Sequence, residues 1–375
     1  MEINNSQELI EKLSIKMSNT YNEYKKSTRS GTDNTLLKSY LIETHLLNTC
    51  SDYDNICETL RNTIINYAEI NETKEENLFL IKKDSLEMYL DINNKRFWKM
   101  HTISQVKNSD NFIDHLTKKE GFDKLWLPSR FIRNFSKSKY LYGVKVGFCD
   151  GLSQNDFFED DNNDYNLELN KGFSGLANKF LDLLESSSDF KNKIALSKIQ
   201  ILSGKGKDEF VIDDIKYSGK VTAKGNSFIE HDNNLEELIR DYEKLIDHIE
   251  EKMALGIYDG AIGGVPIEII FDKKDISITS LVKLIFTGKE PFKLLGFVEQ
   301  MSDEYARISA VDLHNGNYGK KINFEISSIG MNVFISRGVC GNSIMRLCTN
   351  LSRFIDPNIM VRGYDIDDIY SIIRE

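Results

Sequence analysis

Proline, cysteine and tryptophan are all scarce in this sequence of 375 residues, which contains 4 prolines, 5 cysteines and 2 tryptophans. An odd number of cysteines without a C-x-x-C pair indicates neither a disulfide framework nor a zinc ribbon. The six histidines form no H-x-x-x-H or H-E-x-x-H pair, the spacing that presents two metal ligands on one helix face. We therefore expect neither a structural metal nor a cofactor.

Long hydrophobic runs are also missing, since no stretch of about 18 or more uncharged apolar residues occurs. The first residues, MEINNSQELIEKL, are polar and acidic, unlike the basic and then apolar start of a secretory signal. We expect a cytoplasmic protein that makes no membrane contact.

What the sequence does contain is typical of a folded multidomain chain, with 40% hydrophobic and 28% charged residues. The pattern predicts an α+β fold, in which an N-terminal helical segment precedes two or three mixed domains with mainly antiparallel sheets. The expected segments are a helical region (1–72), a basic α+β domain (73–150), an acidic linker (151–172), an α+β segment ending in a long acidic helix (173–256) and a C-terminal mixed sheet with a closing helix (257–375).

Hydrophobic periodicity supports this division. Apolar residues at helical spacing run through 9–17, and we extend the helical prediction over 36–41 and 56–64. Short strand-like runs with connections of hairpin length follow at 78–81, 86–90 and 97–103. Further expected strands are 140–148, 194–202, 209–215, 220–225, 267–271, 292–299, 305–313, 320–326 and 331–335, and further helices are 110–119, 173–184, 235–255, 279–286 and 342–355.

The net charge of −10 conceals a strong asymmetry along the chain. Between residues 92 and 145, twelve basic residues oppose four acidic ones, a local net charge of +8, whereas residues 146–170 hold seven acidic residues and no basic one. Polyanion binding needs such a local concentration of positive charge. Aromatic residues are interleaved with the cations between 121 and 142, as in proteins that stack unpaired bases while lysines follow the phosphates.

We therefore predict a nucleic-acid-binding surface, on single-stranded or duplex nucleic acid. Its candidate residues are the cations of this region together with one tryptophan: Lys118, Lys119, Lys124, Trp126, Arg130, Arg133, Lys137 and Lys139. A structural interpretation stands beside it, in which the aromatic side chains form core and the cations pair with the acidic loop at 156–168.

Two enzymatic alternatives remain open. Asp213, Asp214 and Lys216 form a D-x-K pattern on a strand-like run, as in nucleases where carboxylates hold Mg²⁺ and a lysine orients the attacking water. Mg²⁺ is expected only if that alternative holds.

The second alternative concerns Cys340, which precedes a predicted helix and lies six residues before Arg346, the C-x5-R spacing of a cysteine phosphatase. The residues between them lack the glycines of such a phosphate loop, so this thiol-dependent phosphatase or hydrolase is the weaker alternative. The leading hypothesis is a non-catalytic nucleic-acid-binding or assembly subunit of a prokaryotic multi-protein system, with a protein partner and a role in antiviral defence.

Overall fold

The computed structural model describes residues 5–26, 35–46, 53–64, 67–119, 121–149, 166–170, 175–258, 260–274, 276–313 and 319–374. It contains two compact units, both discontinuous in sequence: Met1–Leu125 with Gln200–Glu237, and Trp126–Ile199 with Leu238–Glu375. The strand β9 and the helix α6 each pass from one unit into the other.

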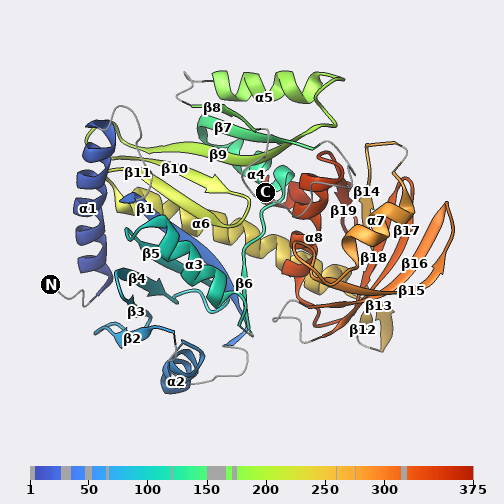
Figure 1. Ribbon diagram of the computed structural model, residues 1–375, viewed down its shortest axis with the longest axis horizontal. Helices are drawn as coiled ribbons and strands as arrows, with labels where there is room; N and C mark the ends of the chain where they lie inside the picture. Colours follow the sequence, from blue (N-terminus) through green and yellow to red (C-terminus); the bar gives the residue numbers. More distant parts are fainter. Residues whose placement is uncertain are drawn as a thin grey trace. The chain divides into compact units, whose positions relative to one another are not determined.

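The first unit is a twisted antiparallel sheet with helices (Figure 1). Its helices are α1 (Ser6–Lys26), α2 (Tyr53–Ile64), α3 (Val106–Leu116) and the beginning of α6 (Phe228–His248). Its strands are β1 (Leu37–Thr44), β2 (Glu69–Glu72), β3 (Leu78–Lys83), β4 (Leu86–Asp91), β5 (Phe97–Thr102), β6 (Phe122–Lys124), β10 (Phe210–Lys216), β11 (Lys220–Gly225) and the end of β9 (Ile194–Gly204). Within this unit the strand order is β2-β3-β4-β5-β1-β11-β10, and β6 also pairs with β1.

The two faces of the central strand β1 belong to different cores, because successive side chains of a strand point in opposite directions. Leu37 packs with Leu9, Leu13 and Met17, which α1 presents at a spacing of four residues. On the opposite face, Ile42 packs in a cluster that includes the apolar side of α3. Each fully buried leucine contributes roughly 2 kcal/mol of hydrophobic stabilisation.

The helical prediction for residues 36–41 is wrong, because this stretch forms most of β1. All eight residues of β1 are buried, so the strand carries no polar and apolar alternation that a sequence pattern would reveal. Lys38, Ser39 and Glu43 are polar and nonetheless buried. Two of the helices expected within 1–72 are confirmed as α1 and α2.

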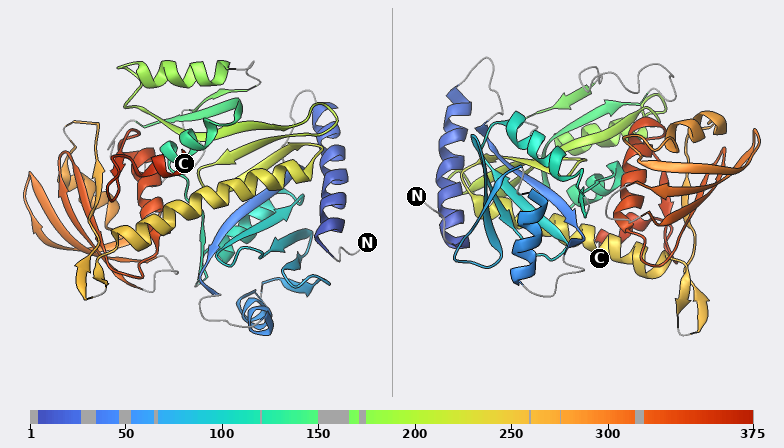
Figure 2. Two further views of the ribbon diagram at one scale, coloured as in Figure 1. Left: turned by 180° about the vertical axis from the view of Figure 1, so that it is seen from behind. Right: turned by 60° about the horizontal axis from the view of Figure 1, so that its bottom comes forward.

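The second unit contains a six-stranded antiparallel sheet in the order β15-β16-β17-β18-β14-β19 (Figure 2). Its strands are β14 (Ile267–Ile270), β15 (Leu294–Met301), β16 (Tyr305–Asp312), β17 (Lys321–Ser327), β18 (Gly330–Ile335) and β19 (Met360–Arg362). The helices of the unit are α4 (Ser129–Ser136), α5 (Leu176–Ser186), the end of α6, a π-helical turn (Ile249–Met253), α7 (Ile278–Ile285), α8 (Gly341–Phe354) and a 3-10 turn (Ile369–Arg374).

Alternate residues of β16 and β17 are buried, including Ile308 and Phe324. Phe286 at the end of α7 packs edge-on against Phe324, with the ring centroids 4.8 Å apart. The same unit holds β7 (Tyr140–Phe148), which pairs with β8 (Asn166–Leu169). A separate hairpin, β12 (Gly256–Tyr258) with β13 (Ala261–Gly263), projects from its unit in the right-hand view of Figure 2.

The predicted α+β class with mainly antiparallel sheets is confirmed, and the helix α1 precedes the first strand. Of the expected acidic linker 151–172, only 166–170 lie among the described residues, and β8 forms there. None of the helices in the described part of the chain has the length and apolarity needed to cross a membrane.

Candidate nucleic-acid interface

Three lysines gather around the C-terminal end of α3 in the first unit. Lys83 ends β3, in a hairpin whose next residue, Asp84, has a φ of 50°. Lys118 and Lys119 directly follow α3, and their N–H groups donate to the carbonyls of His115 (3.3 Å) and Leu116 (2.9 Å). Cations are favoured at this end of a helix because the last carbonyls carry partial negative charge. We call Lys83, Lys118 and Lys119 the α3 lysine cluster.

Tyr67 and His115 form the aromatic centre of this cluster. The ring of Tyr67 stacks on the imidazole of His115, with centroids 3.7 Å apart and an interplanar angle of 15°. The ammonium of Lys83 lies 3.0 Å from the centroid of the Tyr67 ring. A cation on an aromatic face is attracted by the ring quadrupole, which holds Lys83 beside His115.

The three lysines of the cluster all act on the electrostatic environment of His115. Burial lowers the pKa of His115 below its ordinary value, and Lys119, Lys83 and Lys118 lower that pKa further. The charged groups that shift this pKa are all lysines. Three cations thus lie close enough to one imidazole at the end of α3 to disfavour its protonation.

Three of the cations predicted as contacts are instead held in ion pairs. Lys124 Nζ lies 2.6 Å from Asp114 Oδ1, and Arg130 Nη1 lies 3.2 Å from Asp368 Oδ2. Arg133 makes the most extensive set, with its guanidinium 2.5 Å from Asp182 Oδ1 and 3.0 Å from Glu185 Oε1 and with a hydrogen bond to Asn178. Asp368, Asp182 and Glu185 come from distant parts of the sequence and lie outside the basic stretch 92–145, whereas Asp114 lies within it.

The other predicted contacts have different surroundings. Trp126 is only 8% exposed, so neither face of its indole is open to a base. Lys137 is exposed, and Lys139 is half-buried with its ammonium 5.5 Å from the centroid of Phe135. Lys118, Lys119 and Lys124 belong to the first unit, and the other five predicted residues belong to the second.

The nuclease alternative groups Asp213 and Asp214 with Lys216, but the two carboxylates point to opposite faces of β10. Asp213 is fully buried and binds His231 and Asn234, whereas Asp214 pairs with Lys224 at 3.1 Å. Two carboxylates on opposite faces of one strand cannot hold the same ion.

Asp213 belongs instead to a buried polar network that the sequence did not reveal. Ser39 Oγ lies 2.7 Å from both His101 Nδ1 and His231 Nε2, and His231 Nδ1 lies 2.6 Å from Asp213 Oδ1. Asn234 donates to the second oxygen of Asp213 at 2.7 Å. Ser39, His231 and Asp213 thus have the connectivity of a hydrolase triad.

That network has no access for a substrate. Ser39, His231 and Asp213 are each 0% exposed, and His101 is 1% exposed. Burial, together with Lys99 and His231, lowers the pKa of His101 well below its ordinary value. Fully satisfied buried networks rigidify a core, so we assign these residues to the stability of the first unit.

Cys340 and Arg346 also lack the arrangement of a cysteine phosphatase. Cys340 precedes α8, but the N–H of Gly341 at the start of this helix donates to Glu250 Oε1 at 2.7 Å. A carboxylate of the chain itself therefore occupies the position that a phosphate would need. Arg346 forms a buried ion pair with Asp312 and also donates to the carbonyl of Phe292, so its guanidinium already has partners within the chain.

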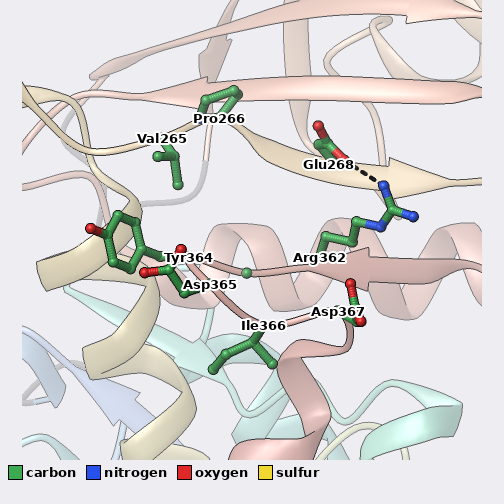
Figure 3. Close-up of a pocket in the computed structure, with 9 residues that line it drawn as sticks. Val265, Pro266, Glu268, Arg362, Tyr364, Asp365, Ile366 and Asp367 are labelled. Atoms are coloured by element: carbon green, nitrogen blue, oxygen red, sulfur yellow. Dashed lines mark hydrogen bonds and ion pairs between the residues drawn. The ribbon is translucent and has the colours of Figure 1, made fainter.

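A hollow of about 410 Å³ lies beside β14 and β19 in the second unit (Figure 3). Glu268 and Arg362 pair across one end of it at 3.4 Å, while Asp365 and Tyr364 lie at the other end. Three carboxylates, including Asp367, oppose one arginine, so the lining repels phosphate groups.

The chain thus combines an antiparallel α+β architecture with a lysine cluster at a helix end. A family model described as MJECL33-like protein matches residues 1–370, and the chain belongs to this family. It is 27% identical over 399 aligned residues to the protein MJECL33 of Methanocaldococcus jannaschii, covering 96% of this chain and 94% of that protein. No solved structure matches the chain.

Proposed function

We propose that the protein binds nucleic acid without catalysing a reaction on it, and that the α3 lysine cluster makes the phosphate contacts. The observation that carries this proposal is the gathering of three lysines at the end of α3, where Lys83 from β3 lies over the Tyr67 ring that stacks on His115, and Lys118 and Lys119 follow the helix. Burial and these three lysines together lower the pKa of His115. Lysines brought close together raise the local positive potential, and each phosphate that they neutralise releases condensed counterions.

The proposed contacts include fewer residues than the surface predicted from the sequence. Lys118 and Lys119 remain as contacts and Lys83 joins them, whereas Lys124, Arg130 and Arg133 already have carboxylate partners. Lys137 and Lys139 stay predictions, as do a protein partner, a cytoplasmic location and a role as a subunit in antiviral defence.

The test is a titration of labelled oligonucleotides with the protein across a range of salt concentrations. The variant Lys83→Ala/Lys118→Ala/Lys119→Ala removes the cluster. A matched control, Lys283→Ala/Lys289→Ala/Lys321→Ala, removes the same charge from exposed lysines of the second unit. Both variants change the net charge by the same amount, so a difference between them reports position and not total charge.

We expect the plot of log affinity against log salt to become shallower by about 2.7 in the cluster variant, because each phosphate contact on duplex DNA contributes about 0.9 to the slope. The control should keep the wild-type slope. Absence of wild-type binding at about 50 mM salt, where such contacts are strong, would show that the proposal is wrong. An equal loss in both variants would show that the cluster is not the interface.

A further inference from the structure

We infer that the α3 lysine cluster recognises the phosphate backbone of double-stranded nucleic acid and does not stack unpaired bases. This inference rests on the proposed function, and it concerns which form of nucleic acid the site accepts. It depends on the faces of the aromatic rings around the cluster.

Tyr67 is the aromatic residue at the centre of the cluster, and both faces of its ring are in use. One face stacks on His115 at a centroid distance of 3.7 Å and a nearly parallel angle, and the ammonium of Lys83 lies 3.0 Å from the ring centroid. A stacked neighbour and a cation on the ring axis cannot share one face. A base would have to displace one of them before it could stack on this ring.

The neighbouring aromatic residues in this unit offer no substitute. Phe112, on the same helix as His115, is 1% exposed, and Phe122, just after the cluster, is 0% exposed. Both belong to the apolar core beneath α3. The cluster therefore presents ammonium groups to a ligand, while the rings of Tyr67, Phe112 and Phe122 are covered.

These contacts favour duplex over single strand for two physical reasons. Proteins that hold single strands gain about fivefold or more in affinity from each base that stacks on an aromatic side chain, and this gain is missing here. A duplex also carries about one charge per 1.7 Å of its axis, so lysines gain more from it than from a strand with half the phosphates. Phosphate recognition carries no base information, so we expect little dependence on sequence.

The experiment compares three ligands of equal length with the wild-type protein: a duplex, one of its two strands, and a thymine oligomer. We expect the duplex to bind most tightly, with a salt slope of about 0.9 for each contact against about 0.7 for the single strands. Changing the duplex sequence should alter its affinity less than threefold, as phosphate contacts do not distinguish base pairs.

The variant Tyr67→Leu tests the covered ring directly, with Tyr67→Phe as a control that keeps the ring. If no base stacks on Tyr67, the affinity of Tyr67→Leu for the thymine oligomer stays within about twofold of that of Tyr67→Phe. A loss of fivefold or more relative to Tyr67→Phe, the amount expected for one stacked base, would overturn the inference. Tighter wild-type binding of a single strand than of the duplex would also overturn it while leaving the proposed function intact. If none of the three ligands binds at low salt, the proposed function fails as well.

Discussion

The change Ser39→Ala tests the buried network of the first unit most directly. The Ser39 hydroxyl contacts both His101 Nδ1 and His231 Nε2, at 2.7 Å each. Alanine removes this hydroxyl without adding volume, and all three residues are buried to 1% exposure or less. The substitution therefore leaves two imidazole nitrogens without their hydrogen-bond partner in a site closed to solvent.

The expected cost follows from those two nitrogens. A buried polar group that loses its partner costs about 1 to 3 kcal/mol, so two such groups lower the free energy of unfolding by about 2 to 6 kcal/mol. Whole domains have stabilities of only about 5 to 15 kcal/mol. The variant should consequently be strongly destabilised in the first unit.

The two tryptophans allow each unit to be followed separately, because Trp98 lies in the first unit and Trp126 in the second. In a Trp126→Phe background, urea unfolding observed by tryptophan fluorescence reports Trp98 alone. Ser138→Ala, at an exposed serine of the second unit, is the matched control and should change stability by less than about 0.5 kcal/mol. A loss below about 1 kcal/mol in Ser39→Ala, with an unchanged urea slope, would refute the reasoning, because the network would then contribute no more than one ordinary hydrogen bond.

Two further predictions concern pH and the arginines. Because the folded-state pKa of His101 is depressed, the unfolded chain binds more protons below about pH 6.5. The free energy of unfolding should therefore fall by up to about 1.4 kcal/mol per pH unit as the pH drops from about 6.5 towards 5. The same urea assay in His101→Asn should give a shallower decline, and an identical decline would exclude His101 as the cause. Arg133→Ala should change oligonucleotide affinity less than twofold, since Asp182 and Glu185 already hold the guanidinium. A salt slope reduced by about 1, as for a lost phosphate contact, would contradict this.

The parts of the fold that could be predicted are the helices and strands with one buried face and one face exposed to solvent. The strands β16 and β17 alternate in burial, and the sequence shows the same alternation at 305–313 and 320–326. The strand β1 could not be predicted this way, because both of its faces are covered. Its apolar residues then occur at spacings that a helix also explains.

The candidate site could be predicted only in part, for a related reason. Lys118 and Lys119 were found because they lie within one basic stretch of sequence. Nothing local connects them to Lys83 or Tyr67, which the fold brings to His115 from 32 and 48 residues away along the chain. The residues of the buried network lie even further apart in the sequence, since Ser39 and His231 are separated by 192 residues.

The local charge of +8 between residues 92 and 145 overstates the positive surface, because folding supplies acids from outside that window. Among the described residues, at least five of its twelve cations lie in ion pairs with carboxylates: Arg96 with Glu43, Lys99 with Asp91 and Asp232, Lys124 with Asp114, Arg130 with Asp368, and Arg133 with Asp182. Only Asp114 among these acids lies inside the window. Burial of Lys99 disfavours its charge, yet the carboxylates around it raise its pKa above the ordinary value. A cation held in this way already has its counterion and gains little from a phosphate. We therefore expect the affinity for nucleic acid to depend on the α3 lysine cluster, whose charges lower the pKa of His115 together with burial. The total number of basic residues in the stretch 92–145 should matter less.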